Sequence, residues 1–343
     1  MKLLIIGGTG NISRWILREV QYKDCDISVF NRHQTMQDLP SGVKQITGDR
    51  TNHDDFEKKI QNQGPFDCVI DMVGYETEDA LSSLRAFEGK TEQYIFCSTV
   101  DVYSKNQSSY PVFDDQPFGA SETFTYAFKK MQMEKIFWDA YEKFGFPLTV
   151  IRPGFTYSEG WSPLLTCFGG QSYHLDRLIR NKPVIIQDEG NMCWSPLHAE
   201  DLARAFVSAM GNKKAIGKSY NITGDELLNW KTMHEKTASI LNAAGPDFIF
   251  IPTKDLAALA PERSQGCVDN FQFNCLFDNS KAKNELGFRF TVSFDAGASR
   301  CIDYLIATNG IEKESKYPFY DQVILKWESL NCGPYSKKLK SVS

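Results

Sequence analysis

The sequence has no hydrophobic run long enough to cross a membrane. Its longest early apolar run, Leu3 to Ile6, is followed at once by a glycine loop. A membrane helix needs about 20 consecutive apolar residues. A secretory signal needs an apolar stretch and a small-residue cleavage site after it. We therefore expect neither a membrane partner nor a cleaved leader in this chain of 343 residues, and we expect a cytoplasmic protein.

Cysteine and histidine spacings that bind metals are also missing. The nine cysteines include no CxxC, and the five histidines include no HxH or HxxxH. An odd number of widely spaced cysteines is typical of reduced thiols rather than of a disulfide framework. Structural zinc sites need closely spaced ligands of these types. The sequence therefore predicts no metal site.

The chain has fewer basic than acidic residues. Lys and Arg number 38 against 43 Asp and Glu, which gives a formal net charge of -5. A general nucleic-acid binder relies on basic surface, so the balance disfavours a nucleic-acid partner. Hydrophobic residues make up 42% and charged residues 24% of the chain, which are ordinary values for a globular protein and exclude wholesale disorder.

Strand and helix patterns alternate through the first half of the chain. Continuous short apolar runs are typical of strands buried on both faces, and the segments between them space their apolar residues as helices do. The predicted strands are residues 2–6, 27–30, 43–46, 68–70, 94–97 and 148–151, and the longest predicted helix is 124–144. Repeated alternation of this kind indicates an α/β fold with a Rossmann-type doubly wound parallel sheet.

The alternation loosens after Arg152. Shorter strand patterns at 184–186, 219–222 and 248–250 mix with helical patterns near 200–210 and 230–241. We therefore predict a dinucleotide-binding Rossmann domain at residues 1–152. Residues 153–310 are predicted to form mostly a smaller α+β substrate lobe, interleaved with returns to the sheet. Residues 311–343 are predicted to be a C-terminal extension.

A glycine loop opens the chain. Gly7, Gly10 and Ser13 have the spacing GxxGxxS between a buried strand and a helix. The first glycine allows a tight turn, the second lets the backbone approach a pyrophosphate, and the helix N-terminus offers free N–H groups to the anion. This context predicts a dinucleotide-binding site.

The residues at the end of the second predicted strand indicate whether the chain prefers NAD or NADP. NAD binding favours an acidic residue about 20 positions after the loop, where its carboxylate holds the ribose 2′-hydroxyl. Asn31 and Arg32 stand there instead, and a guanidinium suits a 2′-phosphate. We therefore expect NADP, with NAD as the alternative. Asp49 follows the third strand, where its carboxylate is a candidate acceptor for the adenine amino group.

Tyr126 and Lys130 form a Y-x-x-x-K pattern in the longest predicted helix. Residues four apart share one helix face, and a nearby ammonium lowers the pKa of a phenol from its usual value of about 10. Such a tyrosine can exchange a proton with a substrate hydroxyl. Ser98 and Thr99 lie just upstream, at the carboxyl end of the fifth strand, where ligands bind in sheets of this kind.

Taken in order, these motifs resemble the extended short-chain dehydrogenase/reductase family, in its epimerase/dehydratase branch. The matching segments are Gly7 to Ser13, Gly48-Asp49-Arg50, Ile70-Asp71, Ser98-Thr99 with Val102-Tyr103, Tyr126 to Lys130, Arg152-Pro153, His198 to Asp201, and Glu285 to Phe288. The resemblance covers roughly residues 1–305. It extends to the chloroplast stem-loop RNA-binding relatives, which share an early segment like Phe30-Asn31-Arg32.

The resemblance implies a role for each residue of the catalytic group. Thr99 would bond the substrate oxygen, Tyr126 would act as acid and base, and Lys130 would tune Tyr126 and hold the nicotinamide ribose. Asp101 stands where dehydrating relatives carry an additional acid/base. The alternative for Asp101 is a carboxylate that caps a turn or is merely solvated.

The resemblance also implies sets of binding residues. Those expected to contact the cofactor are Gly7, Thr9, Gly10, Asn11, Ile12, Asn31, Arg32, Asp49, Arg50, Met72, Val73, Tyr126, Lys130 and Pro153. Thr99 is also expected to contact the substrate, and Phe155 and Trp194 are candidates for the same role by their position alone. A tryptophan such as Trp194 can stack on a sugar ring, but a place in the core is the alternative.

Three functions follow as hypotheses. The first is an NAD(P)-dependent epimerase or dehydratase that converts a sugar or nucleotide sugar through a transient ketone. The second is an NADPH-dependent carbonyl reductase or dehydrogenase, and the third is an RNA-binding protein on the same fold. The apolar surface of the helix at 124–144, with Phe128, Met131, Ile136, Trp138 and Tyr141, exceeds what one sheet face needs, and it suggests a homodimer.

Overall fold

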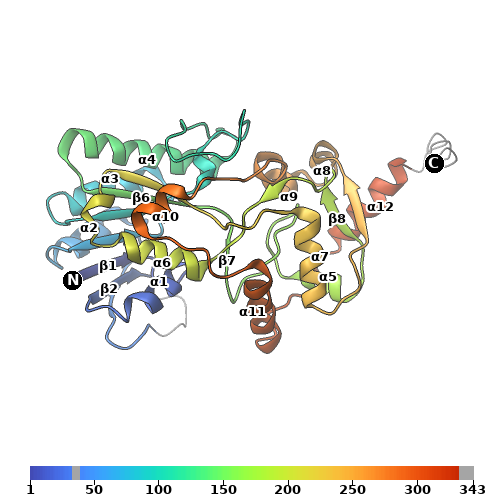
Figure 1. Cartoon of the computed structure of the whole chain (residues 1–343), viewed down its shortest axis with the longest axis horizontal. Coiled ribbons are helices and arrows are strands. Elements are labelled where there is room, and N and C mark those ends of the chain that lie inside the picture. The colour runs from blue at the N-terminus through green and yellow to red at the C-terminus, as the bar shows by residue number, and fades with distance from the viewer. Residues whose placement is uncertain (33–38, 332–343) are drawn as a thin grey trace. The chain divides into compact units, whose positions relative to one another are not determined.

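The computed structural model describes residues 1–32 and 39–331, and its chain divides into two compact units (Figure 1). Unit 1 comprises Met1–Tyr157, Ser195–Glu226 and Leu276–Ser293. Unit 2 comprises Ser158–Trp194, Leu227–Cys275 and the described residues from Phe294 onward. The chain therefore leaves and re-enters unit 1 twice.

The core of unit 1 is a seven-stranded parallel sheet with the order β11-β6-β5-β4-β1-β2-β3. Its strands are β1 (Lys2–Ile6), β2 (Asp26–Asn31), β3 (Lys44–Thr47), β4 (Cys68–Asp71), β5 (Tyr94–Cys97), β6 (Leu148–Pro153) and β11 (Lys218–Ile222). The strand order reverses between β1 and β4. Such a switch point opens a crevice at the carboxyl ends of the two strands, where ligands bind in these folds.

Both faces of this sheet are buried, as the continuous apolar strands predict. In β1, Leu3 and Ile5 belong to one hydrophobic cluster, whereas Leu4 and Ile6 belong to another. Successive side chains of a strand point to opposite faces, so an unbroken apolar strand needs a helical layer on each side.

Helices supply these two layers (Figure 1). One cluster includes residues of α1 (Ser13–Val20), α6 (Ala199–Ala209) and α10 (Ser280–Leu286). The other includes residues of α2 (His53–Gln61), α3 (Thr77–Phe87) and α4 (Thr125–Phe144). The predicted doubly wound α/β fold is confirmed. All six predicted strands are present within one or two residues, and the pattern at 219–222 proves to be the seventh strand.

The apolar residues that suggested a homodimer are largely packed within the chain. Phe128 and Met131 join a cluster with Val102 and Tyr103, and Ile136, Trp138 and Tyr141 pack against the cluster beneath α4. The excess apolar surface expected for this helix is therefore mostly used inside unit 1. A homodimer stays a prediction.

Unit 2 is a smaller α+β assembly. Its strands pair as β8 (Val184–Gln187) with β13 (Phe248–Ile251) in parallel, and β9 (Cys193–Trp194) with β12 (Leu228–Asn229) in antiparallel orientation. Its helices are α5 (Tyr173–Ile179), α7 (Trp230–Ile240), α8 (Thr253–Leu259), α9 (Pro261–Gly266), α11 (Phe294–Ala307) and α12 (Phe319–Asn331). The segment predicted as an extension from residue 311 thus includes α12, whose Tyr320, Val323 and Ile324 lie in the core of this unit.

Short elements complete the chain. They are β7 (Thr156–Tyr157), which pairs with β10 (Leu197–His198), and the short helical turns η1 (Val100–Val102), η2 (Lys213–Ala215), η3 (Cys267–Phe271) and η4 (Glu314–Lys316). η1 follows directly after β5 and positions the residues between Thr99 and Tyr103.

Candidate active site

The glycine loop has the geometry that a dinucleotide requires. Gly7 adopts a positive φ of 88°, and a Cβ there would meet Val73 Cγ1 at 2.3 Å. A Cβ on Gly8 would meet Val29 Cγ1 at 2.4 Å. At Gly10 the nearest atom would be Ser13 Oγ at 3.6 Å, so this backbone is open to a close approach. The loop leads into the N-terminus of α1, whose free N–H groups suit a pyrophosphate. These residues fit the predicted cofactor.

Several other predicted cofactor residues line the same strand ends. Met72 N–H donates to the Ile6 carbonyl at 3.0 Å, which joins the end of β4 to that of β1. The side-chain amide of Asn11 donates to the Thr156 carbonyl at 3.2 Å. Pro153 ends β6 in the same parallel sheet. Thr9 and Ile12 belong to the loop itself and are half-buried. The fold therefore brings this part of the predicted set to one sheet edge.

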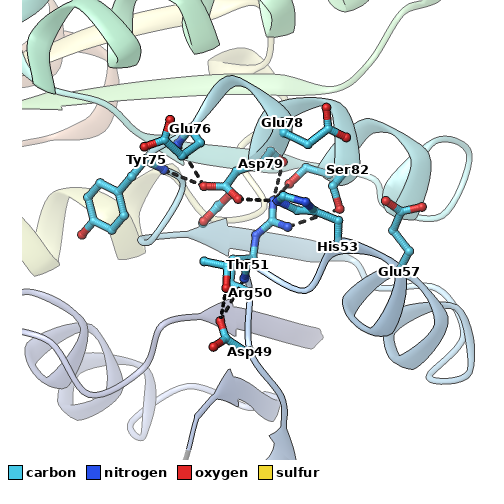
Figure 2. Close-up of polar contacts among 12 residues, drawn as sticks. Asp49, Arg50, Thr51, His53, Glu57, Tyr75, Glu76, Glu78, Asp79 and Ser82 are labelled. Carbon is cyan, nitrogen blue, oxygen red and sulfur yellow. Dashed lines mark hydrogen bonds and ion pairs between the residues drawn. The ribbon is translucent and has the colours of Figure 1, made fainter. Parts of the chain in front are cut away.

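The residues predicted to bind the adenosine half lie at the ends of β2 and β3. Asn31 Oδ1 accepts a hydrogen bond from Gln45 at 2.7 Å, and Arg32 is exposed beside it. Asp49 accepts hydrogen bonds from the Thr51 N–H at 2.9 Å and the Thr51 hydroxyl at 2.8 Å (Figure 2). These bonds, together with the positive charge of Arg32, lower the pKa of Asp49. Asp49 also lines a surface hollow with its neighbours Thr51, Asn52, His53 and Asp54.

Arg50 has a different position from the one that a cofactor role suggests. Only 6% of its surface is exposed, and its guanidinium donates to Ser82, Ser83 and the Asp79 carbonyl of α3 (Figure 2). The group also lies over the Phe56 ring, 4.0 Å from its centroid. The side chain of Arg50 thus fastens α3 to the loop after β3, a structural task that the sequence analysis did not assign.

Thr99, Tyr126 and Lys130 come together from β5 and α4. Thr99 follows β5 and Ser98. Its Oγ1 accepts the Asp101 N–H at 3.2 Å, and its hydroxyl is also hydrogen-bonded to the Tyr126 phenol. Lys130 lies one helical turn after Tyr126 and is 2% exposed, and its Nζ donates to the Cys97 carbonyl at 2.7 Å. The predicted catalytic group therefore forms one cluster.

The electrostatic setting of this cluster differs from the sequence expectation. We expected Lys130 to lower the pKa of Tyr126. Desolvation around the phenol and the nearby Asp101 carboxylate raise it instead, although 43% of the residue surface is exposed. Burial also lowers the pKa of Lys130 itself, whose ammonium is directed to the Cys97 carbonyl. In the free chain, the phenol is therefore held in its protonated form.

Asp101 lies close to this cluster and is paired. Its carboxylate contacts the Lys105 ammonium at 2.5 Å, and the two side chains are 14% and 15% exposed respectively. The Asp101 carboxylate is therefore not freely solvated. It pairs with Lys105, and its charge also acts on the Tyr126 phenol. An acid/base role for Asp101 requires this ion pair to open or to exchange partners.

A buried ion pair that the sequence analysis missed holds α4 against the sheet. Glu134 is fully buried and contacts the Arg152 guanidinium of β6 at 2.6 Å, and it also accepts a hydrogen bond from Ser98. Glu134 follows Lys130 by one further helical turn. This spacing predicts that Glu134 shares a helix face with Lys130, but it does not predict that Arg152 is its partner.

The two residues predicted to contact only substrate have different surroundings. Phe155 in unit 1 is half-buried, with its ring 6.0 Å from that of Tyr157. Trp194 in unit 2 is 3% exposed, and its indole N–H donates to the Phe273 carbonyl at 2.9 Å. Its ring packs against Trp230 at 5.4 Å. This environment fits the alternative of a core tryptophan.

Three absences hold for residues 1–32 and 39–331. No group of three or more His, Cys, Asp or Glu side chains in these ranges is placed to hold a metal ion. No helix among them has the length and apolar character needed to cross a membrane. The cysteines in these ranges form no disulfide among themselves, and Cys97 beneath the catalytic cluster is a free thiol.

Comparison with known families shows a similarity over part of the chain. Residues 77–223 match the model of the NAD dependent epimerase/dehydratase family. The matched segment is less than half of the chain and includes residues of both units. The matched segment includes Thr99, Tyr126 and Lys130, and it confirms the resemblance inferred from the motifs. It supports an enzyme of this NAD-dependent type.

Similarities to curated proteins and to solved structures extend over most of the chain. The chloroplast stem-loop binding protein of 41 kDa b from Arabidopsis thaliana is 24% identical over 95% of this chain and 84% of its own length. The 2'-dehydrokanamycin reductase of Streptomyces kanamyceticus is 23% identical over 81% of this chain and 77% of its own. The fold is similar to that of UDP-glucuronic acid 4-epimerase from Bacillus cereus in complex with NAD. Here the TM-score is 0.70, with 19% identity over 90% of this chain and 99% of the other.

Proposed function

We propose that this protein is an NAD(P)-dependent epimerase or dehydratase that acts on a sugar or nucleotide sugar through a transient ketone. The observation that carries this proposal is the joining of Thr99, Tyr126 and Lys130 into one cluster, in a sheet whose glycine loop fits a dinucleotide. A similar fold in a UDP-glucuronic acid 4-epimerase supports the substrate class.

In this mechanism the residues of the chain move protons and orient the substrate. The Thr99 hydroxyl bonds the substrate oxygen, and Tyr126 Oη takes the proton of that hydroxyl as its carbon is oxidised. A dinucleotide held by the glycine loop and Lys130 would supply the hydride acceptor for this oxidation and the hydride donor for the later reduction. The ketone acidifies the adjacent carbon, and the Asp101 carboxylate takes its proton once the ion pair with Lys105 has opened. Asp101 then returns this proton to the carbon or gives it to a departing hydroxyl group, which leaves as water. Because desolvation raises the pKa of Tyr126 in the free chain, positive charge must be brought near the phenol before it can act as a base.

Arg32 supports NADP as the preferred dinucleotide. It lies exposed directly after β2, and neither Arg32 nor the preceding Asn31 is a carboxylate that could hold a ribose 2′-hydroxyl. Affinities for NADPH and NADH, measured by titration calorimetry, test this choice. We expect tighter binding of NADPH, and we expect Arg32→Ala to reduce that preference about tenfold while NADH binding stays unchanged. Equal affinities in the unaltered protein would contradict a preference for NADP, and tighter binding of NADH would favour NAD.

The decisive experiment concerns cofactor retention. The protein is purified without added cofactor and denatured, and any released dinucleotide is identified by mass. Retained oxidised dinucleotide is expected, because an epimerase or dehydratase returns the hydride to the same substrate. An empty site that binds NADPH reversibly would favour a carbonyl reductase, as the similarity to 2'-dehydrokanamycin reductase also suggests. No binding of either dinucleotide would overturn the enzyme proposal.

Tyr126→Phe tests the catalytic assignment. The change removes only the hydroxyl, so we expect turnover to fall by two or more orders of magnitude while folding and dinucleotide binding persist. Turnover is measured with the substrate found by screening UDP-sugars, and circular dichroism checks the fold. Lys143→Met near the other end of the same helix is the control and should remain active, since this exposed ammonium pairs with Asp139. A loss of less than about tenfold for Tyr126→Phe would contradict the assignment.

RNA binding is the second candidate function, because the chloroplast stem-loop binding protein matches 95% of this chain. Binding to a stem-loop RNA, measured from 50 to 200 mM salt, distinguishes the two functions. Tight and salt-sensitive binding by a protein that takes up no dinucleotide would favour the RNA function.

We also expect a homodimer, which light scattering at micromolar concentration tests.

A further inference from the structure

The Lys130 ammonium lies between two aromatic rings. Its Nζ is 4.8 Å from the centroid of the Phe96 ring and 4.9 Å from that of Tyr75, while it donates to the Cys97 carbonyl at 2.7 Å. Aromatic faces at such distances attract a cation, and more strongly where water is excluded. Lys130 is therefore held on two sides by rings and on a third by a carbonyl.

The two rings differ in their access to solvent. Phe96 belongs to β5 and is fully buried, whereas Tyr75 follows β4 and is 50% exposed. A ligand that accepts a hydrogen bond from Lys130 must therefore approach from the side that Tyr75 borders. An ammonium has three N–H donors, so donation to Cys97 leaves donors for such a ligand.

The backbone next to Tyr75 is fastened at several points. The Asp79 carboxylate accepts the Tyr75 N–H at 2.9 Å and the Glu76 N–H at 3.0 Å. The Glu76 carboxylate pairs with the Lys129 ammonium of α4 at 2.6 Å. Figure 2 shows the Tyr75 ring directed away from the cluster of Asp79, Arg50 and His53. These contacts hold the segment after β4 against α4, next to Lys130.

We propose that Tyr75 is a positioning residue of the dinucleotide site, whose ring holds the Lys130 ammonium and borders the nicotinamide end of the bound cofactor. The inference rests on the proposed function, because it takes Lys130 as the residue that bonds the nicotinamide ribose. The face of the Tyr75 ring attracts the Lys130 ammonium, and the Tyr75 hydroxyl is not needed for this attraction. Replacement by Phe should therefore preserve it, and replacement by Leu should remove it.

Titration calorimetry with NAD⁺ and with NADP⁺ compares the unaltered protein, Tyr75→Phe and Tyr75→Leu. We expect the affinity of Tyr75→Phe to stay within about twofold and that of Tyr75→Leu to fall about tenfold, which corresponds to about 1.4 kcal/mol. Tyr304→Leu is the matched control, because Tyr304 in unit 2 is also about half exposed, at 42%. Its affinity should not change. Equal losses for Phe and Leu, or no loss for Leu, would overturn the proposal.

A double-mutant cycle with Lys130→Met tests whether the two residues act together. If Tyr75 acts through Lys130, Tyr75→Leu should cause little further loss of affinity in the Lys130→Met background. Full additivity would overturn the proposal. Failure of the unaltered protein to bind either dinucleotide would overturn the proposed function and this inference with it. Normal binding by both the unaltered protein and Tyr75→Leu would overturn the inference alone.

Discussion

At the scale of single residues, Glu134 places a charged carboxylate in the buried interior next to the candidate site. It is fully buried and pairs with Arg152, which is itself 3% exposed. Removing one partner of a buried pair leaves the other charge without compensation, at a cost of about 3–5 kcal/mol. We therefore expect Glu134→Gln to lower the free energy of unfolding by about 3 kcal/mol, as measured by urea denaturation.

The same helix offers a matched control for this prediction. Asp139 pairs with Lys143 at 3.0 Å, but both side chains are more than half exposed. Exposed pairs of this kind contribute about 0.3–0.5 kcal/mol, so Asp139→Asn should change the stability by no more than that. If Glu134→Gln proves as stable as Asp139→Asn, the buried pair does not hold α4 to the sheet.

Asp114 provides a prediction of pH dependence. Burial raises the pKa of Asp114 to about 6, although its carboxylate accepts the Asn221 N–H at 2.5 Å. An unfolded Asp has a pKa of about 3.9. The charged form is thus disfavoured in the folded state, and the resulting cost in stability is absent below about pH 4, grows toward pH 6 and is complete above it.

Asp114→Asn should remove this cost, because an amide oxygen can still accept the Asn221 N–H without carrying charge. We expect the variant to gain about 1 kcal/mol in unfolding free energy at pH 8 and nothing at pH 4. Urea denaturation at the two pH values measures the difference. A gain that is equal at both pH values would show that the charge of Asp114 is not its cause.

At the scale of elements, the N-terminus of α3 is fastened by one carboxylate. Asp79 accepts the backbone N–H groups of Tyr75 and Glu76 and contacts His53 Nε2 at 2.8 Å (Figure 2). Burial acts to raise the pKa of Asp79, but these hydrogen bonds outweigh it and the pKa is lowered. The stabilisation is therefore present above about pH 4 and is lost as the pH falls through the lower pKa of the folded state.

Asp79→Asn should weaken this helix start, since a neutral amide cannot replace a carboxylate that accepts three hydrogen bonds. We expect a loss of about 1–2 kcal/mol at pH 7, and faster hydrogen exchange of the Tyr75 and Glu76 amides. Asp54→Asn in the first turn of α2 is the control, because Asp54 is exposed. Unchanged exchange at Tyr75 in Asp79→Asn would contradict the capping role.

At the scale of the whole molecule, dinucleotide binding should stabilise the folded chain. A ligand that binds only the folded state at 100 times its Kd adds about 2.7 kcal/mol. We expect a rise of several degrees in Tm, measured by calorimetry with and without NADPH. Tyr126→Phe should retain this rise. Gly7→Ala should lose it, because a Cβ there would collide with Val73 in a backbone with positive φ. A rise preserved in Gly7→Ala would place the ligand elsewhere.

Local rules made much of this protein predictable from its sequence. Continuous apolar strands imply burial on both sheet faces, and Leu3 and Leu4 confirm this by packing into different clusters. The turn at Gly7 needs a residue free of Cβ, and the spacing of Tyr126 and Lys130 places both on one helix face. Each of these inferences depends on neighbours within a few positions of the chain.

Contacts between distant segments decided the rest. The Arg50 guanidinium serves α3 rather than an open site, and the Arg152 guanidinium finds its carboxylate on α4. The pKa of Tyr126 rises instead of falling, because the folded chain removes part of the water around the phenol and brings the Asp101 carboxylate near it. Tyr75 lies beside Lys130 only after β4 and α4 have come together. Sequence patterns record which residues share a strand or helix face, whereas burial and the pairing of charges depend on which faces meet.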